Sequence, residues 1–567
     1  MNRRALALGA TGIAVFSLGS MIAPPAMAQA RQDEAMSTTT NTGTTPAALV
    51  NLFDDWREVA EPARLNGAPD FSQDALNSQA AMLEQMRTRL KNLDRSGWSK
   101  RDVADAQLIE AEMNGLDFDL RVRQPWARDP SYFATVFGEE SDVPAHEGPS
   151  ADVIDLFTYD YPLSASDAAK LEGRLKSVPV LLKRAKTYLA NGNARDLWQY
   201  GGRAFAGQAA TLDELAKGTL KMRTLEGEKH ASLEGAPSSL RNAVVVARDA
   251  STEFGAWVKQ EAASKTGPSG VGKENYSWYM RHVQLVPYDW DEQVTLLQRE
   301  LDRSLAGLAM EEWRNRKLPP LDPIADVAAY NAFAKDKMAQ FIDFVIDTGF
   351  VPDKPYYRQA LEAQTLDYVP PEKRVFFYHV TARDPWPLYS HDIHWVELAR
   401  LKHEPDASPI RQKPPLYNIY AARSEGYATA FEELVMQAGL YKENPRGREL
   451  VWIMLANRAA RGLASLHVQA NEMDLKQAGI FHSEWTPRGW ADPESDLVGF
   501  EQLLYLRQPG YGTSYIVGKQ LLDDQIARRI HAAQMRGEAA NIPQIFAEIM
   551  AEGIVPWPLM DTQVPEK

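Results

Sequence analysis

The 567-residue chain has 62 Lys and Arg against 76 Asp and Glu, a formal net charge of −14, and no cysteine. The lack of cysteine excludes disulfides, thiolate metal sites and cysteine nucleophiles. A net negative chain repels nucleic-acid phosphates and anionic membrane surfaces, so we expect neither nucleic acid nor membrane as a partner of the processed protein. The length is compatible with one large domain or two to three smaller ones.

The first 28 residues have the pattern of an export signal. Arg3 and Arg4 precede an uncharged run, and residues 26–28 form an A-x-A cleavage pattern. The uncharged run is too short and too rich in Gly, Ser and Thr to predict a membrane span. Both the general secretory and the twin-arginine routes fit this pattern, and either would deliver a periplasmic or secreted protein. Residues 29–46 are polar without periodicity, and we interpret them as a disordered linker.

Apolar residues recur at helical spacing along most of the remaining chain, beginning with Leu49, Leu52, Phe53 and Trp56. Residues 127–151 are rich in Pro, Gly and acidic residues and are interpreted as a loop. Residues 264–274 are the best internal break. They separate an N-terminal helical part (47–263) from a C-terminal, catalytic-like part (271–560), and we expect the two to form one compact unit.

One segment departs from the helical pattern. Residues 374–381 are aromatic and β-branched and are bounded by prolines, which predicts a strand. Further helices are expected from about His391 and across 417–439, 446–478 and 514–535. The fold class predicted from these patterns is mainly α, with a short β-sheet beside the active-site helices.

His391-Asp392-Ile393-His394-Trp395-Val396-Glu397 is the densest group of chemically active side chains. On a helix, positions i, i+3 and i+6 fall within an arc of about 120°, which places His391, His394 and Glu397 on one face. Imidazole and carboxylate groups are zinc ligands. The spacing is not that of the regular H-E-x-x-H motif, and a solvated or hydrogen-bonded histidine pair is the alternative.

Glu425 and Glu432 share a helix face with small residues such as Ala428, which would let another helix approach closely. A buried carboxylate needs a partner, because an unpaired buried charge is costly. The partner of Glu425 could be a metal ion or an arginine of the following helix, and the residue pattern alone favours the arginine. We therefore predict that Arg458 or Arg461 pairs with Glu425, Glu432 or Glu433.

A Gly-rich turn at 507–515 opens a further helix. Its similarity to a phosphate-binding loop is superficial, because five residues rather than four separate Gly512 from Gly518 and Gln520 replaces the required Ser or Thr. Tyr511 and Tyr515 could donate hydrogen bonds to an oxyanion or polarise a carbonyl. A packed turn without a chemical role is the alternative.

Several segments together resemble a large bacterial family of exported proteins that is catalogued as domain of unknown function 885. Glu425-Gly426-Tyr427-Ala428, with Glu432-Glu433-Leu434 and Gly439-Leu440-Tyr441, is similar to the family's "EGWALYAEEL…GLY". Arg458-Ala459-Ala460-Arg461 is similar to its "RAARL" helix, and Pro509-Gly510-Tyr511-Gly512 resembles its C-terminal signature. The resemblance covers most of the chain after the signal segment.

The resemblance implies a large helical, zinc-peptidase-like fold and a metallopeptidase-like hydrolase acting on peptides or another amide. Many family members carry H-E-x-x-P-G-H after a short strand, and His391-Asp392-Ile393-His394 holds the corresponding place here. Carried over, the zinc ligands would be His391, His394 and Glu425, the base Asp392 or Glu397, and the oxyanion donor Tyr511 or Tyr515.

Two other functions stay open at this point. One is a non-zinc enzyme on the same scaffold that acts on a small molecule, and the other is a non-catalytic periplasmic binding protein. We predict that His391, His394 and Glu425 converge on one cavity even if no zinc is bound, whereas a Glu425 carboxylate more than about 8 Å from both imidazoles, too far for ligands of one zinc, would favour one of the other two functions. For a shared zinc ion, their ligand atoms must approach within about 3–4 Å of one another.

Overall fold

The computed structural model describes residues 45–561; the expected export signal at 1–28 and linker residues 29–44 lie outside this range. The described chain is mainly α-helical, which confirms the predicted fold class. The helices of the N-terminal part are α1 (Ala47–Ala60), α2 (Gln73–Lys91), α3 (Lys100–Phe118), α4 (Pro125–Arg128), α5 (Ala165–Tyr188), α6 (Arg195–Lys217) and α7 (Ser238–Ala262).

The C-terminal part is also mainly α-helical. Its helices are α8 (Lys273–His282), α9 (Trp290–Asn315), α10 (Val327–Asp347), α11 (Pro355–Glu362), α12 (Phe376–Thr381), α13 (Trp386–His391), α14 (Ile393–His403), α15 (Ala421–Ala438), α16 (Gly447–Gln469), α17 (Leu475–Trp485), α18 (Asp496–Arg507), α19 (Tyr511–Met535), α20 (Ile542–Ala551) and α21 (Trp557–Asp561). Within 45–561, no helix is both long and apolar enough to cross a membrane.

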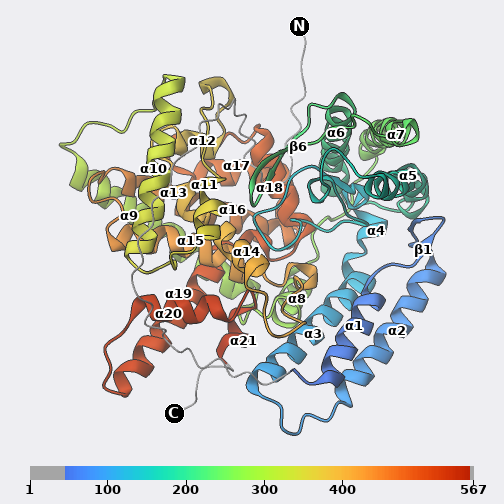
Figure 1. The fold of residues 1–567 in the computed structure, drawn as a ribbon, viewed down its shortest axis with the longest axis horizontal. Coiled ribbons are helices and arrows are strands. Elements are labelled where there is room, and N and C mark those ends of the chain that lie inside the picture. The colour runs from blue at the N-terminus through green and yellow to red at the C-terminus, as the bar shows by residue number, and fades with distance from the viewer. Residues whose placement is uncertain (1–44, 562–567) are drawn as a thin grey trace.

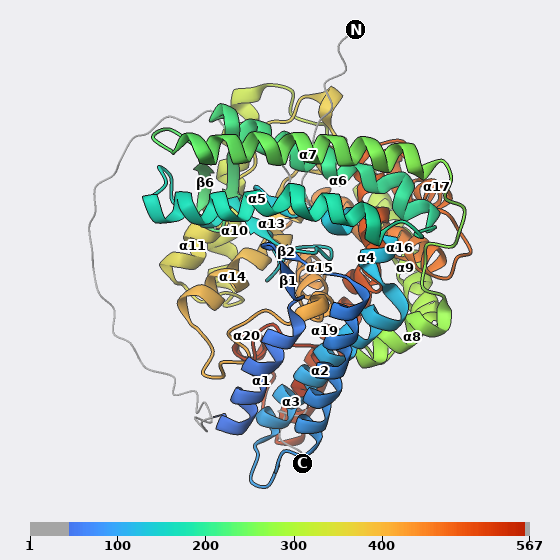
Figure 2. The same cartoon turned by 90° about the vertical axis from the view of Figure 1, so that its right-hand side faces the viewer.

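The helices form three groups (Figure 1). The blue helices α1, α2 and α3 pack side by side, and α5, α6 and α7 lie across the molecule as a separate layer (Figure 2). The yellow-to-red helices of the C-terminal part fill the remainder. The larger hydrophobic core combines α1–α3 with the C-terminal helices, and a second core is built around α5–α7. The two parts of the chain therefore share one core.

The strands of the described chain are short and pair locally. β1 (Arg64–Leu65) is antiparallel to β2 (Ala68–Pro69), β3 (Val136–Phe137) is parallel to β4 (Ile154–Asp155), and β5 (Lys221–Thr224) is antiparallel to β6 (Gly227–His230). The loop between β3 and β4 carries a residue of the candidate site described below. A short sheet does therefore lie beside the site, but it comes from residues 136–155.

The strand predicted at 374–381 is wrong, because Phe376–Thr381 forms α12. Its backbone is satisfied locally, since the His379 N–H donates to the Val375 carbonyl at 3.1 Å. Phe376 and Val380 are buried in the larger core. The strand preference of aromatic and β-branched residues expresses packing against neighbouring strands. Here those residues pack against helices instead.

Helices α15 and α19 cross at a contact between two glycines. A Cβ on Gly426 would lie 2.2 Å from the Gly518 carbonyl carbon, and a Cβ on Gly518 would lie 1.9 Å from the Ala422 carbonyl oxygen. Only residues without a side chain permit this approach. The crossing brings Glu425, beside Gly426 on α15, within reach of side chains from the start of α19.

The predicted internal break at 264–274 is an irregular segment that runs into α8 and is hydrogen-bonded to two other parts of the chain. The Gly267 N–H donates to the Asn193 carbonyl at 2.8 Å, and the Gly272 N–H donates to the Gln469 carbonyl at 2.8 Å. The segment thus connects the start of α6 with the end of α16.

Candidate functional site

His391 and His394 lie on either side of a break between two helices. α13 ends at His391, α14 begins at Ile393, and Asp392 between them has φ −63° and ψ 3°. The Trp395 N–H donates to the Asp392 carbonyl at 3.0 Å, a 3₁₀-type bond. In 3₁₀ geometry the side chains at i and i+3 eclipse each other. The tightened turn therefore offsets the short histidine spacing and replaces the single helix expected from the sequence.

Glu425 meets both imidazoles from α15. Its Oε2 lies 3.5 Å from the Nε2 of His391 and 3.5 Å from the Nε2 of His394. One ligand atom from each of the three side chains lies within 4.8 Å of the other two. Two ligand atoms of a tetrahedral zinc site are about 3.4 Å apart, given metal–ligand distances near 2.1 Å. The three side chains therefore lie together, as expected from the sequence, and metal binding by them stays a prediction.

The arginines pair with other carboxylates. Arg458 lies 2.6 Å from Glu432, which confirms the predicted pairing between the two helices. Arg461 pairs with Glu501 of α18. The arginine partner favoured for Glu425 is therefore wrong, because two imidazoles and a tyrosine hydroxyl surround that carboxylate instead.

Further side chains orient the two imidazoles through their other nitrogens. The Glu432 carboxylate lies 2.9 Å from His391 Nδ1, and Ser424 Oγ lies 3.1 Å from His394 Nδ1. Arg458, 3.1 Å from the same nitrogen of His391, is itself held by Glu432. Arg458 donates to His391 Nδ1, so a neutral His391 ring carries its proton on Nε2, toward Glu425. A metal ion bound at Nε2 would move this proton to Nδ1, which lies 2.9 Å from Glu432, the arrangement that carboxylates provide for zinc-binding histidines.

The cluster fits a metal ion by its unsatisfied atoms and by its charge. His394 is 1 % exposed, and its Nε2 has no hydrogen-bond partner in the described chain. Burial alone lowers the pKa of His394, but the Glu425 carboxylate offsets this and raises it to about 9. Burial raises the pKa of Glu425, yet the two imidazoles hold it well below its usual range. A metal ion can replace the proton that these groups share, because ligands bind it deprotonated.

Glu147, which the sequence reasoning missed, enters the site from the loop between β3 and β4. The Tyr511 hydroxyl lies 2.6 Å from Glu147 Oε1 and 2.5 Å from Glu425 Oε1. The Tyr511 hydroxyl has one proton and can donate to only one of the two carboxyl groups, so it must accept a hydrogen bond from the other. Burial, followed by repulsion from Asp142 and Glu425, raises the pKa of Glu147 to about 8. Near neutral pH the protonated Glu147 therefore donates to Tyr511, and Tyr511 donates to Glu425.

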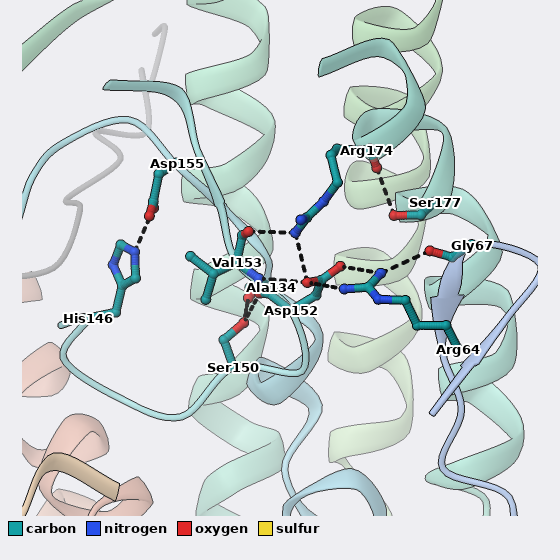
Figure 3. Close-up of polar contacts among 10 residues, drawn as sticks. All are labelled: Arg64, Gly67, Ala134, His146, Ser150, Asp152, Val153, Asp155, Arg174 and Ser177. Carbon is teal, nitrogen blue, oxygen red and sulfur yellow. Dashed lines mark hydrogen bonds and ion pairs between the residues drawn. The ribbon is translucent and has the colours of Figure 1, made fainter. Parts of the chain in front are cut away.

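The loop that carries Glu147 is anchored by polar contacts (Figure 3). His146 lies 2.6 Å from Asp155, and Asp152 accepts hydrogen bonds from Arg64 and Arg174, both at 2.8 Å. The segment was expected to be a loop, and no motif in it marks the acidic residue as part of a site. Only the three-dimensional contact with Tyr511 identifies it.

Asp392 and Glu397, the two predicted bases, have different surroundings. Asp392 is partly buried, and burial raises its pKa to about 8 against the opposing charge of Arg223. Glu397 is 4 % exposed and accepts hydrogen bonds from Arg423 at 2.5 and 3.1 Å. Glu397 is thus occupied by an ion pair, although the sequence placed it on the histidine face.

Tyr515 lies at the edge of the cluster. Its ring is 6.3 Å from the His391 ring and nearly parallel to it, and the Arg461 guanidinium lies 4.3 Å from its centroid. Tyr511 is the tyrosine that touches a predicted ligand, through its hydroxyl contact with Glu425. The structure thus brings both tyrosines beside the three predicted ligands.

The fold is shared with two bacterial proteins of known structure. A candidate lipoprotein of unknown function from Shewanella oneidensis aligns with a TM-score of 0.63 at 12 % identity, over 92 % of this chain and 99 % of that one. A candidate lipoprotein from Colwellia psychrerythraea aligns with a TM-score of 0.56 at 12 % identity, over 90 % and 95 % of the two chains. Identity this low shows a common fold and nothing more.

One sequence comparison identifies a family, and none identifies an activity. No curated protein matches the sequence. The family described as "Bacterial protein of unknown function (DUF885)" matches residues 63–348, just over half of the chain, and the histidines, Glu425 and Tyr511 lie C-terminal to the matched region. The chain therefore belongs to the DUF885 family of bacterial proteins.

Proposed function

We propose that this protein is an exported, zinc-dependent hydrolase that cleaves peptide or other amide bonds. The observation that carries the proposal is the meeting of His391, His394 and Glu425, whose ligand atoms lie within 4.8 Å of one another in a buried setting. Glu432 and Ser424 fix the orientation of the imidazoles. Metal-binding histidines are held in this way by partners at their other ring nitrogen.

The donor set favours zinc in a catalytic role. Two imidazoles and one carboxylate leave a fourth tetrahedral position open, as in zinc hydrolases. When bound, zinc supplies Lewis-acid chemistry, polarising a carbonyl group and activating water for attack. Glu425, His391 and His394 would hold the ion, and the rest of the chemistry falls to neighbouring side chains.

Glu147 is the best placed of these neighbours for proton transfer. Its Oε2 is buried without a hydrogen-bond partner in the described chain. With a pKa of about 8, it carries a transferable proton at neutral pH and can return to the charged form at low cost. We assign it the delivery of its one carboxyl proton, which the contact with Tyr511 places on Oε1, to the leaving nitrogen. Asp392, with its pKa also near 8, is the second candidate.

Two of the three remaining predicted residues, Tyr511 and Glu397, have other roles in the proposed mechanism. Tyr511 stabilises the charge on Glu425 by its hydroxyl hydrogen bond. Glu397 is held by Arg423 and serves as an ion-pair partner rather than as the base.

Export is the part of the proposal that rests on the N-terminal sequence. The charged start, the uncharged run and the A-x-A pattern at 26–28 are typical of a signal peptide. The two proteins with the same fold are described as candidate lipoproteins, which agrees with export. This chain has no cysteine for lipid attachment, so we propose a periplasmic or secreted protein with a peptide or small-molecule substrate.

Metal analysis and peptide hydrolysis test the proposal together. We expect about one zinc ion per purified chain, and cleavage of a mixed peptide library that is abolished by a chelator and restored by zinc. His394→Ala should lose both metal and activity. His403→Ala is the matched control, because His403 is an exposed histidine of the same helix. Failure of the wild type to bind zinc at micromolar concentration would contradict the metal site.

A metal-free enzyme is the second candidate, and one observation favours it. The chain Glu147–Tyr511–Glu425 already forms a hydrogen-bonded acid–base relay between two carboxyl groups of very different pKa. Such pairs provide an acid and a base in one site. Activity on a small molecule that survives chelation would favour this candidate, whereas absence of both metal and activity would favour a binding protein.

A further inference from the structure

A cavity of 210 Å³ is lined in part by three segments that adjoin Glu147, Glu425 and Tyr511 in the sequence. Gly148 to Ala151 follow Glu147 directly, Leu416 to Asn418 precede α15, and Gln508 precedes α19. The end of α1, Phe71, α2, the end of α3, the residues after α3 and α8 form the remaining wall. A group seated in this cavity would touch segments that follow Glu147 and precede Glu425 and Tyr511.

Aromatic rings form part of the cavity wall. Phe71 and Trp126 stack with their ring centroids 5.7 Å apart and their planes 8° from parallel. Tyr132, Tyr279 and Tyr417 also line the cavity. Flat aromatic walls prefer a flat aromatic guest, because offset-stacked and edge-to-face ring contacts add to the gain from burial.

The charged residues of the cavity neutralise each other. Arg123 donates to both carboxylate oxygens of Asp119, each at 2.6 Å, and to the Arg507 carbonyl at 3.1 Å. A bidentate pair of this kind leaves no net charge for a ligand to balance. A charged guest would lose its hydration without gaining a counter-ion, so the cavity selects a neutral group.

Gln508 supplies an unused hydrogen-bond donor. Its amide orientation follows from Asn418, which donates its amide N–H groups to Gln508 Oε1 and to the His146 carbonyl and accepts from the Tyr420 hydroxyl. The Gln508 Nε2 is therefore the free end, and it has no partner in the described chain although Gln508 is 7 % exposed. Such buried donors are rare unless a ligand or water completes them.

The floor of the cavity is held in a strained shape. Tyr417 and Asn418 both have positive φ, 58° and 50°. Glu112 accepts the Leu416 N–H at 3.0 Å, and Gln284 donates to the Tyr417 carbonyl at 2.9 Å. Non-glycine residues with this backbone geometry cluster at ligand sites, where the surrounding contacts enforce it.

We propose that this cavity is the subsite that receives a neutral aromatic side chain of the substrate, with the Gln508 amide donating to a carbonyl oxygen beside it. The assignment of that ligand as substrate rests on the proposed hydrolase function. The binding itself does not require zinc, and this separates the two proposals experimentally.

Ligand-observed NMR with N-acetyl-L-phenylalaninamide tests the binding, and N-acetylglycinamide serves as the control ligand. We expect saturable binding of the phenylalanine probe at about millimolar concentration, before and after chelator treatment, and none of the glycine probe. Ala60→Trp, which places an indole in the cavity wall, should weaken binding at least about tenfold. Ala48→Trp is the matched control, since Ala48 is exposed on the same helix.

Gln508→Met keeps the length of the side chain and removes both the Nε2 donor and the Oε1 acceptor of the Asn418 contact. We expect it to weaken binding of the phenylalanine probe about tenfold, the usual effect of one lost hydrogen bond. Thermal unfolding establishes that each variant is folded. If Ala60→Trp does not fold, Gln508→Met alone tests the subsite. No saturable binding to the wild type, or equal binding to all folded variants, would overturn the subsite. If the wild type binds the phenylalanine probe but neither binds zinc nor hydrolyses peptides, the subsite is supported and the hydrolase function is refuted.

Discussion

Replacing Glu432 by Gln separates stability from metal binding at the centre of the molecule. Glu432 is fully buried, lies 2.6 Å from Arg458 and 2.9 Å from His391 Nδ1. Glu432→Gln keeps the side-chain shape but leaves the Arg458 guanidinium buried without its counter-charge. Breaking a buried pair from one side costs about 3–5 kcal/mol, and loss of a carboxylate behind a metal-binding histidine costs about 10–100-fold in metal affinity.

Glu433, the next residue in the chain, provides a control variant with a similar expected loss of stability. Glu433 pairs with Arg303 at 2.6 Å and Lys519 at 3.2 Å, and despite burial these cations lower its pKa from 4.5 to about 2. At about 1.4 kcal/mol per pKa unit, the pairing contributes on the order of 3 kcal/mol. Glu433→Gln should therefore destabilise the protein to a similar degree, but it has no contact with His391.

Urea unfolding measures the stability of both variants, and competition with a chromophoric chelator measures their zinc affinity. We expect both to lose stability and only Glu432→Gln to lose zinc affinity. A Glu432→Gln protein that remains folded and binds zinc as tightly as the wild type would refute the argument that Glu432 orients His391. Equal losses of zinc affinity in both variants would show that the effect comes from destabilisation alone.

Three further predictions follow from other parts of the structure. Glu147→Gln should lower the activity, because an amide cannot deliver the proton assigned to Glu147. The activity that remains should no longer fall above about pH 8 in a pH–rate profile, because the wild-type group with a pKa of about 8 must be protonated to act; unchanged activity or an unchanged profile contradicts that role. Burial, reinforced by Arg461, lowers the pKa of His482 from 6.5 to about 3, so the unfolded chain binds a proton first and stability falls as the pH drops from 6.5 toward 3. Denaturant titrations should show about 2 kcal/mol less loss between pH 7 and 5 in His482→Gln than in the wild type, and equal losses would place the titration elsewhere. Gly518→Ala should destabilise the α15–α19 crossing by about 1–3 kcal/mol or more, because the new Cβ meets the Ala422 carbonyl oxygen at 1.9 Å; an unchanged melting temperature would mean that the helices separate freely.

Local pattern was sufficient for most helices because their periodicity and end signals reside in neighbouring residues. The stripe that begins at Leu49 is the buried face of α1. The small residues around Glu425 correctly indicated a close helix approach, which proved to be the Gly426–Gly518 crossing. Two elements were misjudged where long-range packing decides conformation: the strand predicted at 374–381 and the single helix expected through His391 and His394.

Local sequence pattern predicted part of the candidate site, and long-range packing decided the rest. The residue types of His391, His394 and Glu425, with the family resemblance, were enough to expect convergence. The partner of Glu425, the ion pair that occupies Glu397 and the entry of Glu147 were decided by tertiary structure alone. A carboxylate's partner is set by whatever long-range folding places within about 3–4 Å, the reach of an ion pair, and sequence spacing carries this information only within one helix.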